Sequence, residues 1–493
     1  MSTSGTVSGN EKKSNYIFYV IGNILLYSGV YGIFALISSV HIEGGVGTTS
    51  MAVCYSSTII PALFVPFLAE RFSVKKMFLA AIICYFLFVF GNIFSSYVSL
   101  MFAGVMNGLG ESSGWTMASL FNIYFAKHAH LDKSAKKDED TYVKQYFGYF
   151  WSIVQSSVGI GNTFVFVILY IDRNVFNQPV PGSNSTHNIT NDNLYKSFCG
   201  ASDCQDPNIT QLNMQQYSPV NKVTYYIIVG TCMLLIAIAF FIHLLFLPEN
   251  IQAIDTTAVE DVDLALVNDD DKESSIHVQV KESVDENLCT NFNTSVIKTV
   301  KMLFCFKHSL IVLLPIYNGF LFSYVYGEMT RAFAACFLGL DDVSISTVLF
   351  SLGNVISSYF SGQMAASYSR NLPFALGYVL DMSLYLTCLL LDPADTERWI
   401  VYILFFGFGL SMGVWITLVN ELYGDYFPAN QDIAFNLWNV LFNVGLFVFY
   451  AISTIFCVYV KIYILMTALT LAMFLYVVSQ CWFGYVSTFC SNT

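Results

Sequence analysis

GLGESSGW (Gly108–Trp115) and GFGLSMGVW (Gly407–Trp415) are the two stretches of this sequence that decide its fold. Both lie inside long apolar segments. A second pair of similar stretches occurs in the same order, PFLAERFSVKKMFLA (Pro66–Ala80) and GQMAASYSRNLPFALG (Gly362–Gly377), and its members begin about 296 residues apart. Each stretch of this pair begins with a proline or a glycine. Each then contains an aromatic residue followed by a serine, and a basic residue comes soon after the serine. Two matched pairs in one order predict that the chain is a parallel duplication of one structural unit.

The composition of the chain is typical of a membrane protein. Hydrophobic residues make up 55% of its 493 residues and charged residues only 11%, whereas an average soluble domain is roughly 25% charged. In lipid the backbone polar groups must be satisfied within each segment, as they are in a helix. The apolar runs are too long and too uniform for the strands of a barrel. We therefore expect an all-α membrane protein and not a soluble enzyme.

Twelve apolar runs are long enough to cross about 30 Å of hydrocarbon. Six precede an acidic segment and six follow it, so the predicted fold has twelve transmembrane helices in two parallel six-helix pseudo-repeats. The runs are Tyr16–Val40, Met51–Ala69, Met77–Phe94, Tyr97–Ala126, Phe147–Ile171, Val223–Leu247, Leu310–Tyr326, Val343–Ala366, Leu372–Leu391, Trp399–Leu422, Ile433–Val458 and Ile462–Tyr485.

The predicted domains follow from these runs. They are an N-terminal tail (1–15), a first six-helix half (16–247), an acidic linker (248–307), a second half (308–486) and a C-terminal tail (487–493). Most of the net charge of −12 comes from the linker, because Glu249–Glu286 holds twelve acidic residues and two lysines. A run of this composition is typical of a solvated, disordered loop.

The distribution of lysine and arginine predicts the orientation in the membrane. If the N-terminus is cytoplasmic, sixteen of the 22 basic residues fall on the cytoplasmic side and six on the other side. Positively charged loops are typical of the cytoplasmic side. Both termini are therefore predicted to be cytoplasmic, in the plasma membrane or, as a less favoured alternative, in an internal membrane.

The connection between the fifth and sixth runs, Asp172–Asn221, is the one long loop assigned to the outside. It contains three glycosylation sequons, at Asn184, Asn188 and Asn208. Cys199 and Cys204 lie in the same loop, where an oxidising compartment would allow a disulfide between them. The alternative is a pair of free thiols.

The stretch Pro66–Lys75 resembles the G-x-x-x-D-R-x-G-R-K signature of the major facilitator superfamily. Glu70 stands for the acid of that signature, Arg71 for the arginine that follows it and Lys75 for the basic end. Pro66, Ser73 and Val74 depart from the pattern, which weighs against a complete transport cycle. In that superfamily the acid and the arginine hold neighbouring helices together in one state of the cycle.

Several further stretches resemble the uncoordinated-93 (Unc-93) family of the same superfamily. The resemblance covers both halves, from about Tyr16 to Tyr485, and depends on the order and spacing of the stretches. They are GLGESSGWTMASLFNIYF from Gly108, FGYFWSIVQSSVGIGN (Phe147–Asn162), YNGF (Tyr317–Phe320) with its EMTRAF continuation, and NELYGDYFP (Asn420–Pro428). It implies a non-enzymatic accessory or regulatory subunit, or a chaperone, of another membrane protein, because some members regulate potassium channels and one branch chaperones Toll-like receptors.

Acidic residues inside the spans are the main candidates for a functional site. Glu111 lies in the fourth span, where a carboxylate is costly unless it faces a polar cavity or a partner. The alternative is a protonated Glu111 bonded to Ser112, to Ser113 or to a neighbouring helix. In the resembled fold the first, fourth, seventh and tenth helices line a central cavity, which favours cavity exposure for Glu111. The competing function is therefore a secondary transporter in which Glu111 couples solute movement to a proton or a cation.

Four other residues have structural and functional interpretations. Glu328 of the seventh span also falls on a cavity-lining helix, but a surface pair with Arg331 is favoured. Trp115 and Trp415 occupy equivalent places and are interpreted as packing residues, with a ligand platform as the alternative. Asn318 could bridge helices or line the cavity. The acid of the ninth span, Asp381, is expected to join helices by contact with Tyr378 or Tyr385.

No motif for a cofactor, a metal or a nucleotide is found. The twelve cysteines show no metal-ligand spacing, and the sequence has no phosphate-binding loop and no nucleophile elbow. A basic patch for nucleic acid is also absent. The expected partners are the lipid bilayer and another membrane protein, such as a potassium channel, and neither partner nor solute is named by the residues.

Overall fold

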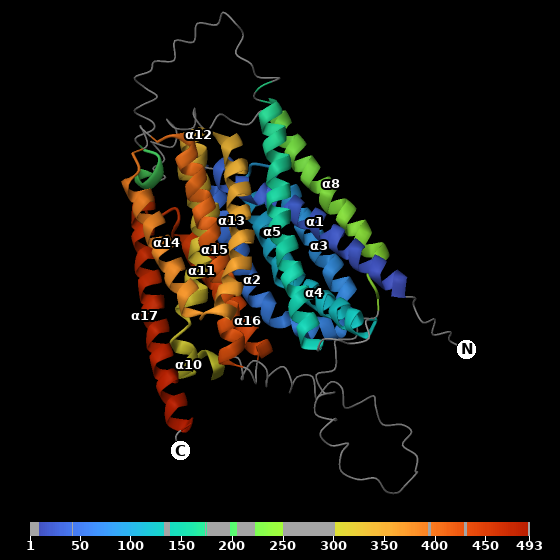
Figure 1. The fold of residues 1–493 in the computed structure, drawn as a ribbon. Coiled ribbons are helices and arrows are strands. Elements are labelled where there is room, and N and C mark those ends of the chain that lie inside the picture. The colour runs from blue at the N-terminus through green and yellow to red at the C-terminus, as the bar shows by residue number, and fades with distance from the viewer. Residues whose placement is uncertain are drawn as a thin grey trace, which may run out of the picture.

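The computed structural model describes residues 9–41, 43–132, 139–172, 174, 198–204, 222–249, 301–392, 396–427 and 431–491, which form a bundle of helices (Figure 1). The predicted glycosylation sites Asn184, Asn188 and Asn208 lie outside the described residues. So do residues 250–300 of the predicted acidic linker and residues 1–8 of the predicted N-terminal tail.

In the part of the chain that the structure describes, six helices make up the first half of the bundle. They are α1 (Gly9–Val40), α2 (Val46–Arg71), α3 (Val74–Gly91), α4 (Tyr97–Asp132), α5 (Glu139–Ile171) and α8 (Lys222–Phe246). Within the described residues, the connections of this half contain the short 3₁₀ turns η1 (Glu43–Gly45) and η3 (Gly200–Ser202).

The second half contains six spans, of which the first is composite. Its elements are α10 (Phe306–Ser309), α11 (Leu313–Ser323), η5 (Tyr324–Ala335), α12 (Cys336–Leu338), α13 (Leu340–Ser367), α14 (Asn371–Leu390), α15 (Arg398–Tyr426), α16 (Gln431–Ile452) and α17 (Val458–Ser491).

Ten helical spans in the described part of the chain are long and apolar enough to cross a membrane. The remaining two helices of the pattern, α2 and α4, are 26 and 36 residues long. The start of α1 and the end of α17 lie at the same end of the bundle (Figure 1), as an even number of crossings requires. The predicted all-α membrane fold of two six-helix halves is confirmed, whereas the domain bounds remain predictions.

Equivalent helices pack in the same way in the two halves. α2 packs along α4 in the first half, and α13 packs along α15 in the second. A Cβ atom on Gly108 of α4 would lie 2.3 Å from the carbonyl oxygen of Cys54, and one on Gly409 of α15 would lie 2.1 Å from that of Phe350. Only glycine allows so close an approach of two helix backbones. The halves meet through α5 against α13 and α2 against α16, two pairs that the duplication relates to each other.

The seventh span is longer than predicted. It continues from α11 through η5, which is a π-helix, to the end of α12, whereas the sequence predicted an end at Tyr326. Glu328 and Arg331 interrupt the apolar run in the sequence, but in the structure both are buried among oppositely charged groups. The span ends at Gly339, whose φ of 115° favours glycine, and α13 begins at the next residue.

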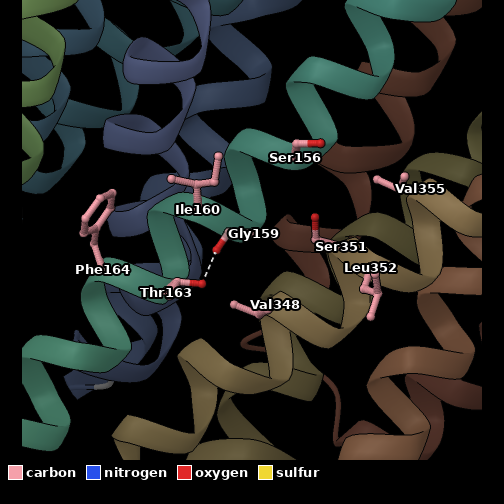
Figure 2. A pocket seen from close by; sticks show the side chains of 9 residues that line it. All are labelled: Ser156, Gly159, Ile160, Thr163, Phe164, Val348, Ser351, Leu352 and Val355. Carbon is pink, nitrogen blue, oxygen red and sulfur yellow. Dashed lines mark hydrogen bonds between the residues drawn. The ribbon is translucent and has the colours of Figure 1, made fainter. Parts of the chain in front are cut away.

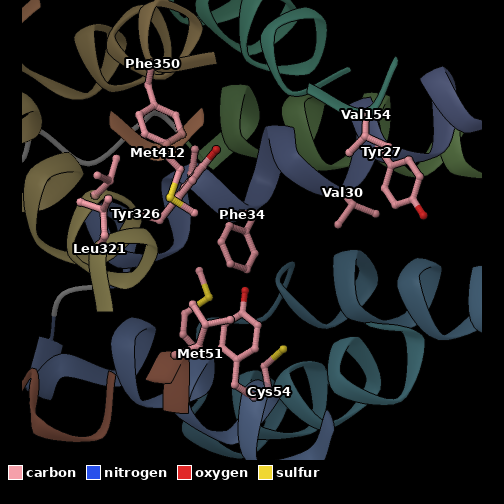
Figure 3. Close-up of a cluster of buried hydrophobic side chains, with 14 of the residues drawn as sticks. Tyr27, Val30, Phe34, Met51, Cys54, Val154, Leu321, Tyr326, Phe350 and Met412 are labelled. Atoms are coloured by element: carbon pink, nitrogen blue, oxygen red, sulfur yellow. The ribbon is translucent and has the colours of Figure 1, made fainter. Parts of the chain in front are cut away.

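Aromatic side chains fill the middle of the bundle where the halves meet. Tyr326 of η5 packs against Phe34 of α1 and Phe350 of α13, with ring centroids 5.5 and 5.6 Å apart (Figure 3). Tyr55 of α2 stacks on Tyr450 of α16 at 5.8 Å. These contacts hold elements of both halves against each other.

The outer surface of the bundle is also apolar. Leu245 of α8 is 72% exposed and Leu390 of α14 is 82% exposed. Large exposed apolar surfaces of this kind are typical of proteins in contact with membrane lipid. The bundle therefore has an aromatic interior and a lipid-facing exterior, and its charged side chains gather in few places.

Candidate functional site

Glu111 lies among aromatic rings in the first half. Trp115, one helical turn further along α4, donates its indole N–H to the carboxylate of Glu111. Tyr27 of α1 stacks on Trp115, with ring centroids 4.9 Å apart and an angle of 15° between the planes. Glu111 is also close enough to Tyr27, to Tyr31 and to Tyr85 of α3 to interact with each electrostatically. The cluster thus combines one carboxylate with four aromatic side chains.

Glu111 and Trp115 are half-buried although they lie on the inward face of α4. Phe102, which is 47% exposed, marks the outward face, and at about 100° per residue Glu111 is on the opposite side of the helix. Asn107 and Ala118 share that inward side and are 0% exposed. The remaining accessible surface of Glu111 and Trp115 therefore lies on the inward side of α4 and not on its lipid-facing side.

The serines next to Glu111 do not bond to it. Ser112 and Ser113 both donate to the carbonyl oxygen of Leu109, at 2.9 Å. The alternative that paired Glu111 with one of these serines is therefore wrong. The partner that the structure provides is Trp115, whose spacing of four residues along a helix was visible in the sequence.

Asp381 is the centre of a similar cluster in the second half. It accepts hydrogen bonds from the indole N–H of Trp415, at 2.7 Å, and from the hydroxyl of Tyr317. The Tyr317 hydroxyl lies 2.9 Å from that of Tyr385. All four side chains are 0% exposed. In the structure Trp415 is a buried residue that joins α15 to α14 through Asp381.

The expected contacts of Asp381 are partly corrected by the structure. Asp381 does join helices, but it does so through Tyr317 of α11 and Trp415 of α15. Tyr385 reaches it only through Tyr317, and the hydroxyl of Tyr378 lies 3.5 Å from that of Thr470 instead. Sequence reasoning missed Tyr317 because the seventh and ninth spans are adjacent only in the folded bundle.

The two carboxylate clusters are built from matching positions of the duplication. The indole N–H of Trp415 also donates to the hydroxyl of Ser411 at 3.1 Å, just as that of Trp115 donates to Glu111, four residues earlier in each case. The carboxylate is therefore supplied by α4 in the first half and by α14 in the second. The matched pairs, each separated by 300 residues, are Trp115 with Trp415, Tyr85 with Tyr385, Glu111 with Ser411 and Ala81 with Asp381.

Glu328 belongs to a buried ion network, which corrects the predicted surface pair. Its carboxylate lies 2.6 Å from Arg331 Nη2 and 2.6 Å from Lys461 Nζ. It also accepts a hydrogen bond from the hydroxyl of Ser453, and Arg331 forms a second ion pair with Asp203. Two acids and two bases thus balance one another inside the bundle, where any unpaired charge would be strongly unfavourable. Asp203, Ser453 and Lys461 were not identified from the sequence, because only the folded bundle brings the α5–α8 connection, the α16–α17 connection and the start of α17 next to η5.

Two disulfides lie next to this ion network, and neither is the predicted one. Cys199 is bonded to Cys336, and Cys204 is bonded to Cys457. The predicted bridge between Cys199 and Cys204 is therefore wrong. Both partner cysteines belong to the second half, whereas Cys199 and Cys204 lie in the connection between α5 and α8 of the first half. The two halves are thus linked covalently at this end of the bundle, called the disulfide end below.

The signature-like stretch is described only in part. The side chains of Glu70 and Arg71 lie outside the described residues, so their predicted roles remain predictions. Lys75 is buried and its Nζ donates to the carbonyl oxygen of Leu247 at 2.8 Å, which fastens α3 to the end of α8. In the corresponding connection of the second half, between α13 and α14, Arg370 pairs with Glu421, at 3.2 Å, and with Asp425.

Asn318 is fully buried on α11. Neither its side-chain oxygen nor its side-chain nitrogen has a hydrogen bond partner within the described residues. The predicted interhelical bond is not seen, and a role of Asn318 in the cavity remains a prediction.

A groove of about 360 Å³ opens between α5 and α13, where the two halves meet (Figure 2). Its polar atoms are already bonded to backbone, since Thr163 donates to Gly159 at 2.8 Å and Ser156 to Ser152 at 2.7 Å. The groove therefore offers small and apolar groups at the surface. Its lining consists of Ser156, Gly159, Ile160, Thr163, Phe164, Val348, Ser351, Leu352 and Val355.

Known proteins of similar sequence bear Unc-93 names. The chain is 27% identical to "Protein unc-93 homolog A" of Bos taurus over 472 residues, which cover 95% of this chain and 93% of that protein. The homolog A of Homo sapiens is also 27% identical, over 473 residues and with the same coverage. The Caenorhabditis elegans protein named "Putative potassium channel regulatory protein unc-93" is 25% identical over 94% of this chain, which spans 61% of that longer protein. The Unc-93 resemblance is confirmed. No protein-family model matches the chain.

Solved structures of similar fold are membrane transporters. The nucleoside transporter NupG aligns with a TM-score of 0.54 and 12% identity, over 93% of this chain and 99% of that one. A D-xylose–proton symporter aligns with a TM-score of 0.55 and 12% identity, over 93% and 96%. At such identities the likeness concerns the fold alone, and it confirms the predicted major facilitator-type fold.

Proposed function

We propose that this Unc-93-type chain is a non-enzymatic accessory subunit that binds another membrane protein and regulates it, with a potassium channel as the partner. The observation that carries the proposal is the similarity, over 94% of the chain, to the C. elegans protein named for potassium channel regulation. The imperfect match of Glu70, Arg71 and Lys75 to the transporter signature also supports it.

The covalent link between the halves is a second support. Alternating access requires two halves to separate in turn at each end of the bundle. At the disulfide end a connection of the first half is bonded to Cys336 and Cys457 of the second half. In addition, the hydroxyl of Ser38 on α1 donates to the carbonyl oxygen of Tyr326 on η5, at 3.0 Å. Both contacts favour a bundle that stays closed at this end.

The groove between α5 and α13 is the surface that we propose for the partner. Close helix packing in membranes depends on small side chains that let two backbones approach. Ser156, Gly159 and Thr163 provide such side chains on a lipid-exposed face of α5, and Ser351 lies opposite on α13 (Figure 2). A transmembrane helix of the partner would fit this arrangement.

Patch-clamp recording of a candidate channel with and without this protein tests the proposal. We expect a changed current, gating or surface density when the protein is present. The Gly159→Leu variant should weaken the effect, because a leucine fills the groove. Gly230→Leu on α8 is the matched control, since a Cβ there meets nothing within 4 Å. Channel properties that are the same with and without the protein would contradict the proposal.

A secondary transporter is the second candidate function. It is favoured by Glu111, whose accessible surface faces the interior of a transporter-type fold. Uptake of a labelled solute into proteoliposomes that the Glu111→Gln variant abolishes would support this function. Uptake that is insensitive to the substitution would exclude Glu111 as the coupling group.

We also propose a plasma-membrane location with both termini in the cytoplasm and with glycans on the outer loop. The excess of basic residues on one side and the sequons at Asn184, Asn188 and Asn208 support this orientation. Glycosidase treatment should lower the apparent mass of the wild-type protein but not of a variant with glutamine at all three positions. A wild-type mass that glycosidase leaves unchanged would contradict the outer placement of this loop.

A further inference from the structure

Two exposed cysteines, Cys305 and Cys481, lie at the end of the bundle opposite the disulfide end. α17 starts at the disulfide end, where the backbone N–H of Val458 donates to the carbonyl oxygen of Asp203 at 2.9 Å. At 1.5 Å per residue this helix carries Cys481 about 35 Å away. Cys305 likewise precedes the span that leads to the disulfide-bonded Cys336. A whole membrane span therefore separates each thiol from the disulfides (Figure 1).

Exposure distinguishes these two thiols from the other free cysteines in the described part of the chain. Cys305 and Cys481 are exposed. The others are buried or half-buried, and they are Cys54, Cys84, Cys232 and Cys388. A thiol buried in apolar surroundings is inert, whereas an accessible thiol can react.

The fold brings the two exposed thiols together from distant parts of the chain. Phe306 directly follows Cys305 and Trp482 directly follows Cys481. The rings of Phe306 and Trp482 are in contact, with centroids 5.8 Å apart. The start of the seventh span and the end of the twelfth therefore present a pair of thiols at one place on the surface.

This place is the boundary between the membrane and the water. One apolar span begins at Phe306 and another ends at Trp482, so each thiol lies within one residue of the end of a span. Phe304, Phe306 and Trp482 are 78%, 58% and 56% exposed. Exposed aromatic rings at the end of a span are typical of the membrane interface. Both thiols are therefore next to lipid hydrocarbon and also within reach of an enzyme at the membrane surface.

Interactions with α15 hold this boundary in place. The Tyr423 hydroxyl lies 3.1 Å from Nε2 of the buried His308 on α10, and the Lys307 ammonium lies 5.0 Å from the centre of the Tyr426 ring. On α17 the side chain of Gln480 donates to the Tyr426 hydroxyl at 2.7 Å. α10 and the end of α17 are thus both fastened to the same helix, which keeps the two thiols at one level of the membrane.

We propose that Cys305 and Cys481 are a paired S-acylation site, at which each thiol takes a long-chain fatty acyl group as a thioester. Cysteines next to a membrane span are typical acceptors of such groups. The proposal rests on the orientation proposed above, in which this end of the bundle is cytoplasmic. The disulfides at the opposite end support that orientation, because disulfides persist in oxidising compartments whereas cytosolic thiols stay reduced.

The modification is an exchange of thioesters. The cysteine sulfur attacks the carbonyl carbon of a long-chain acyl-coenzyme A, delivered by a membrane acyltransferase. A C–S bond to the cysteine forms, the C–S bond to coenzyme A breaks, and the proton of the cysteine thiol ends on the released coenzyme A thiol. No electrons are transferred, so the step needs no oxidant or reductant.

The acyl chains would act on position and not as the anchor of the protein, because the bundle already crosses the membrane many times. Each chain would enter the hydrocarbon beside the exposed rings of Phe304, Phe306 and Trp482. Together they would hold α10 and the end of α17 at the membrane surface. The competing fate of the two thiols is a disulfide between them, which the reducing cytosol disfavours.

Acyl exchange on the full chain, expressed in cultured cells, tests the proposal. Free thiols are blocked with N-ethylmaleimide, thioesters are cleaved with neutral hydroxylamine, and each released thiol is tagged with a maleimide polymer of fixed mass. In a background in which Cys289 and Cys490 are serine, we expect two mass steps. Cys305→Ser and Cys481→Ser should each lose one step, and the double variant should lose both. Without hydroxylamine no step should appear, and a disulfide between the two thiols would give none.

Cys84→Ser is the matched control, because it makes the same change at a half-buried thiol inside a span. It should keep both steps. Size-exclusion profiles identify a variant that fails to fold, and alanine at the same position then replaces serine. The proposal is overturned if the background protein shows no hydroxylamine-dependent step, or if Cys305→Ser or Cys481→Ser keeps both steps. Glycosidase treatment of the same protein reads the orientation separately, and channel recording is not involved, so a failure of either earlier proposal is distinguishable from a failure of this one.

Discussion

Glu111 and Asp381 lie in clusters of the same side-chain types in the two halves, but they differ in how those clusters are completed. Asp381, Trp415 and Tyr317 are 0% exposed and bonded to one another. Glu111 and Trp115 are half-buried and lie on the inward side of α4. The carboxylate lies on α14 in the closed copy and on α4 in the half-buried copy. The closed copy is fully buried, whereas the copy in the first half keeps part of its surface accessible.

The disulfide end shows a similar contrast between the halves. The second half is fastened there by the buried ion network of Glu328, Arg331 and Lys461, to which the α5–α8 connection adds Asp203. The first half is fastened by neutral groups, since His41 lies 3.2 Å from the hydroxyl of Tyr225, which donates to Asn92 in turn. Charge therefore stabilises one half, and a hydrogen-bonded chain stabilises the other.

Removal of Lys461 should have the largest effect on stability. Lys461→Met leaves Glu328 and Asp203 facing Arg331 alone, so one buried negative charge loses its partner. We expect a loss of about 3–5 kcal/mol, the usual effect of breaking a buried ion pair, measured as thermal unfolding in detergent. Lys222→Met, at an exposed position on α8, is the control. Added Glu328→Gln should restore part of the loss, and an unchanged melting temperature for Lys461→Met alone would contradict this account of the network.

Substitution of Asp381 should lower the stability of the protein more than substitution of Glu111. Asp381→Ala removes the charged acceptor of Trp415 and Tyr317 and leaves these buried donors only the hydroxyls of Ser411 and Tyr385, which should destabilise the protein by about 3 kcal/mol. Glu111→Ala should change stability by less than about 1 kcal/mol, because groups facing an accessible space can be solvated. Thermal unfolding of both variants checks this difference. Equal losses would mean that the two clusters have the same structural role.

Acidification should act on the disulfide end of the first half. Burial lowers the pKa of His41, which follows the last residue of α1, from its usual value to about 4. The unfolded chain therefore binds a proton between about pH 6.5 and pH 4 that the folded chain does not, so stability falls as the pH falls through this window. At pH 5 the loss should be about 2 kcal/mol. Melting curves at pH 7.5 and pH 5 should converge when His41 is replaced by glutamine, and an unaltered pH dependence in His41→Gln would assign the loss to other groups.

The smallest expected effect tests whether Ala81 and Glu111 occupy positions equivalent to those of Asp381 and Ser411. Ala81→Asp places a carboxylate where the second half has Asp381, and Glu111→Ser reproduces Ser411. With Glu111 present, Ala81→Asp brings two carboxylates together and should destabilise the protein. The double substitution should restore about 1 kcal/mol as a coupling energy, measured in a double-mutant cycle. Strictly additive effects would contradict the proposed equivalence of α3 with α14 and of α4 with α15.

The fold was predictable because its signals are local and repeated. Runs of hydrocarbon length and the paired motifs at Gly108–Trp115 and Gly407–Trp415 required no knowledge of distant contacts. Trp115 could have been assigned to Glu111 from the spacing of four residues on a helix.

The remaining features depend on contacts between distant parts of the chain. The disulfide partners of Cys199 and Cys204 are 137 and 253 residues away, so the bridge between near neighbours was the simpler but incorrect pairing. Glu328 was assigned to the surface because its partner Lys461 precedes the twelfth span, and only the folded bundle brings the two together. The bond between Tyr317 and Asp381 was not predicted either, because these residues are also brought together only in the folded bundle.

The difference in accessibility between the clusters can be measured directly with cysteines at matching positions. Glu111→Cys and Ser411→Cys are compared in a background in which Cys289, Cys305, Cys481 and Cys490 are serine. Their rates of modification by a small, water-soluble methanethiosulfonate reagent report on access to each cluster. We predict that the thiol at position 111 reacts at least tenfold faster than the thiol at position 411. Equal rates would contradict the claim that one copy of the cluster is open to the interior and the other is closed.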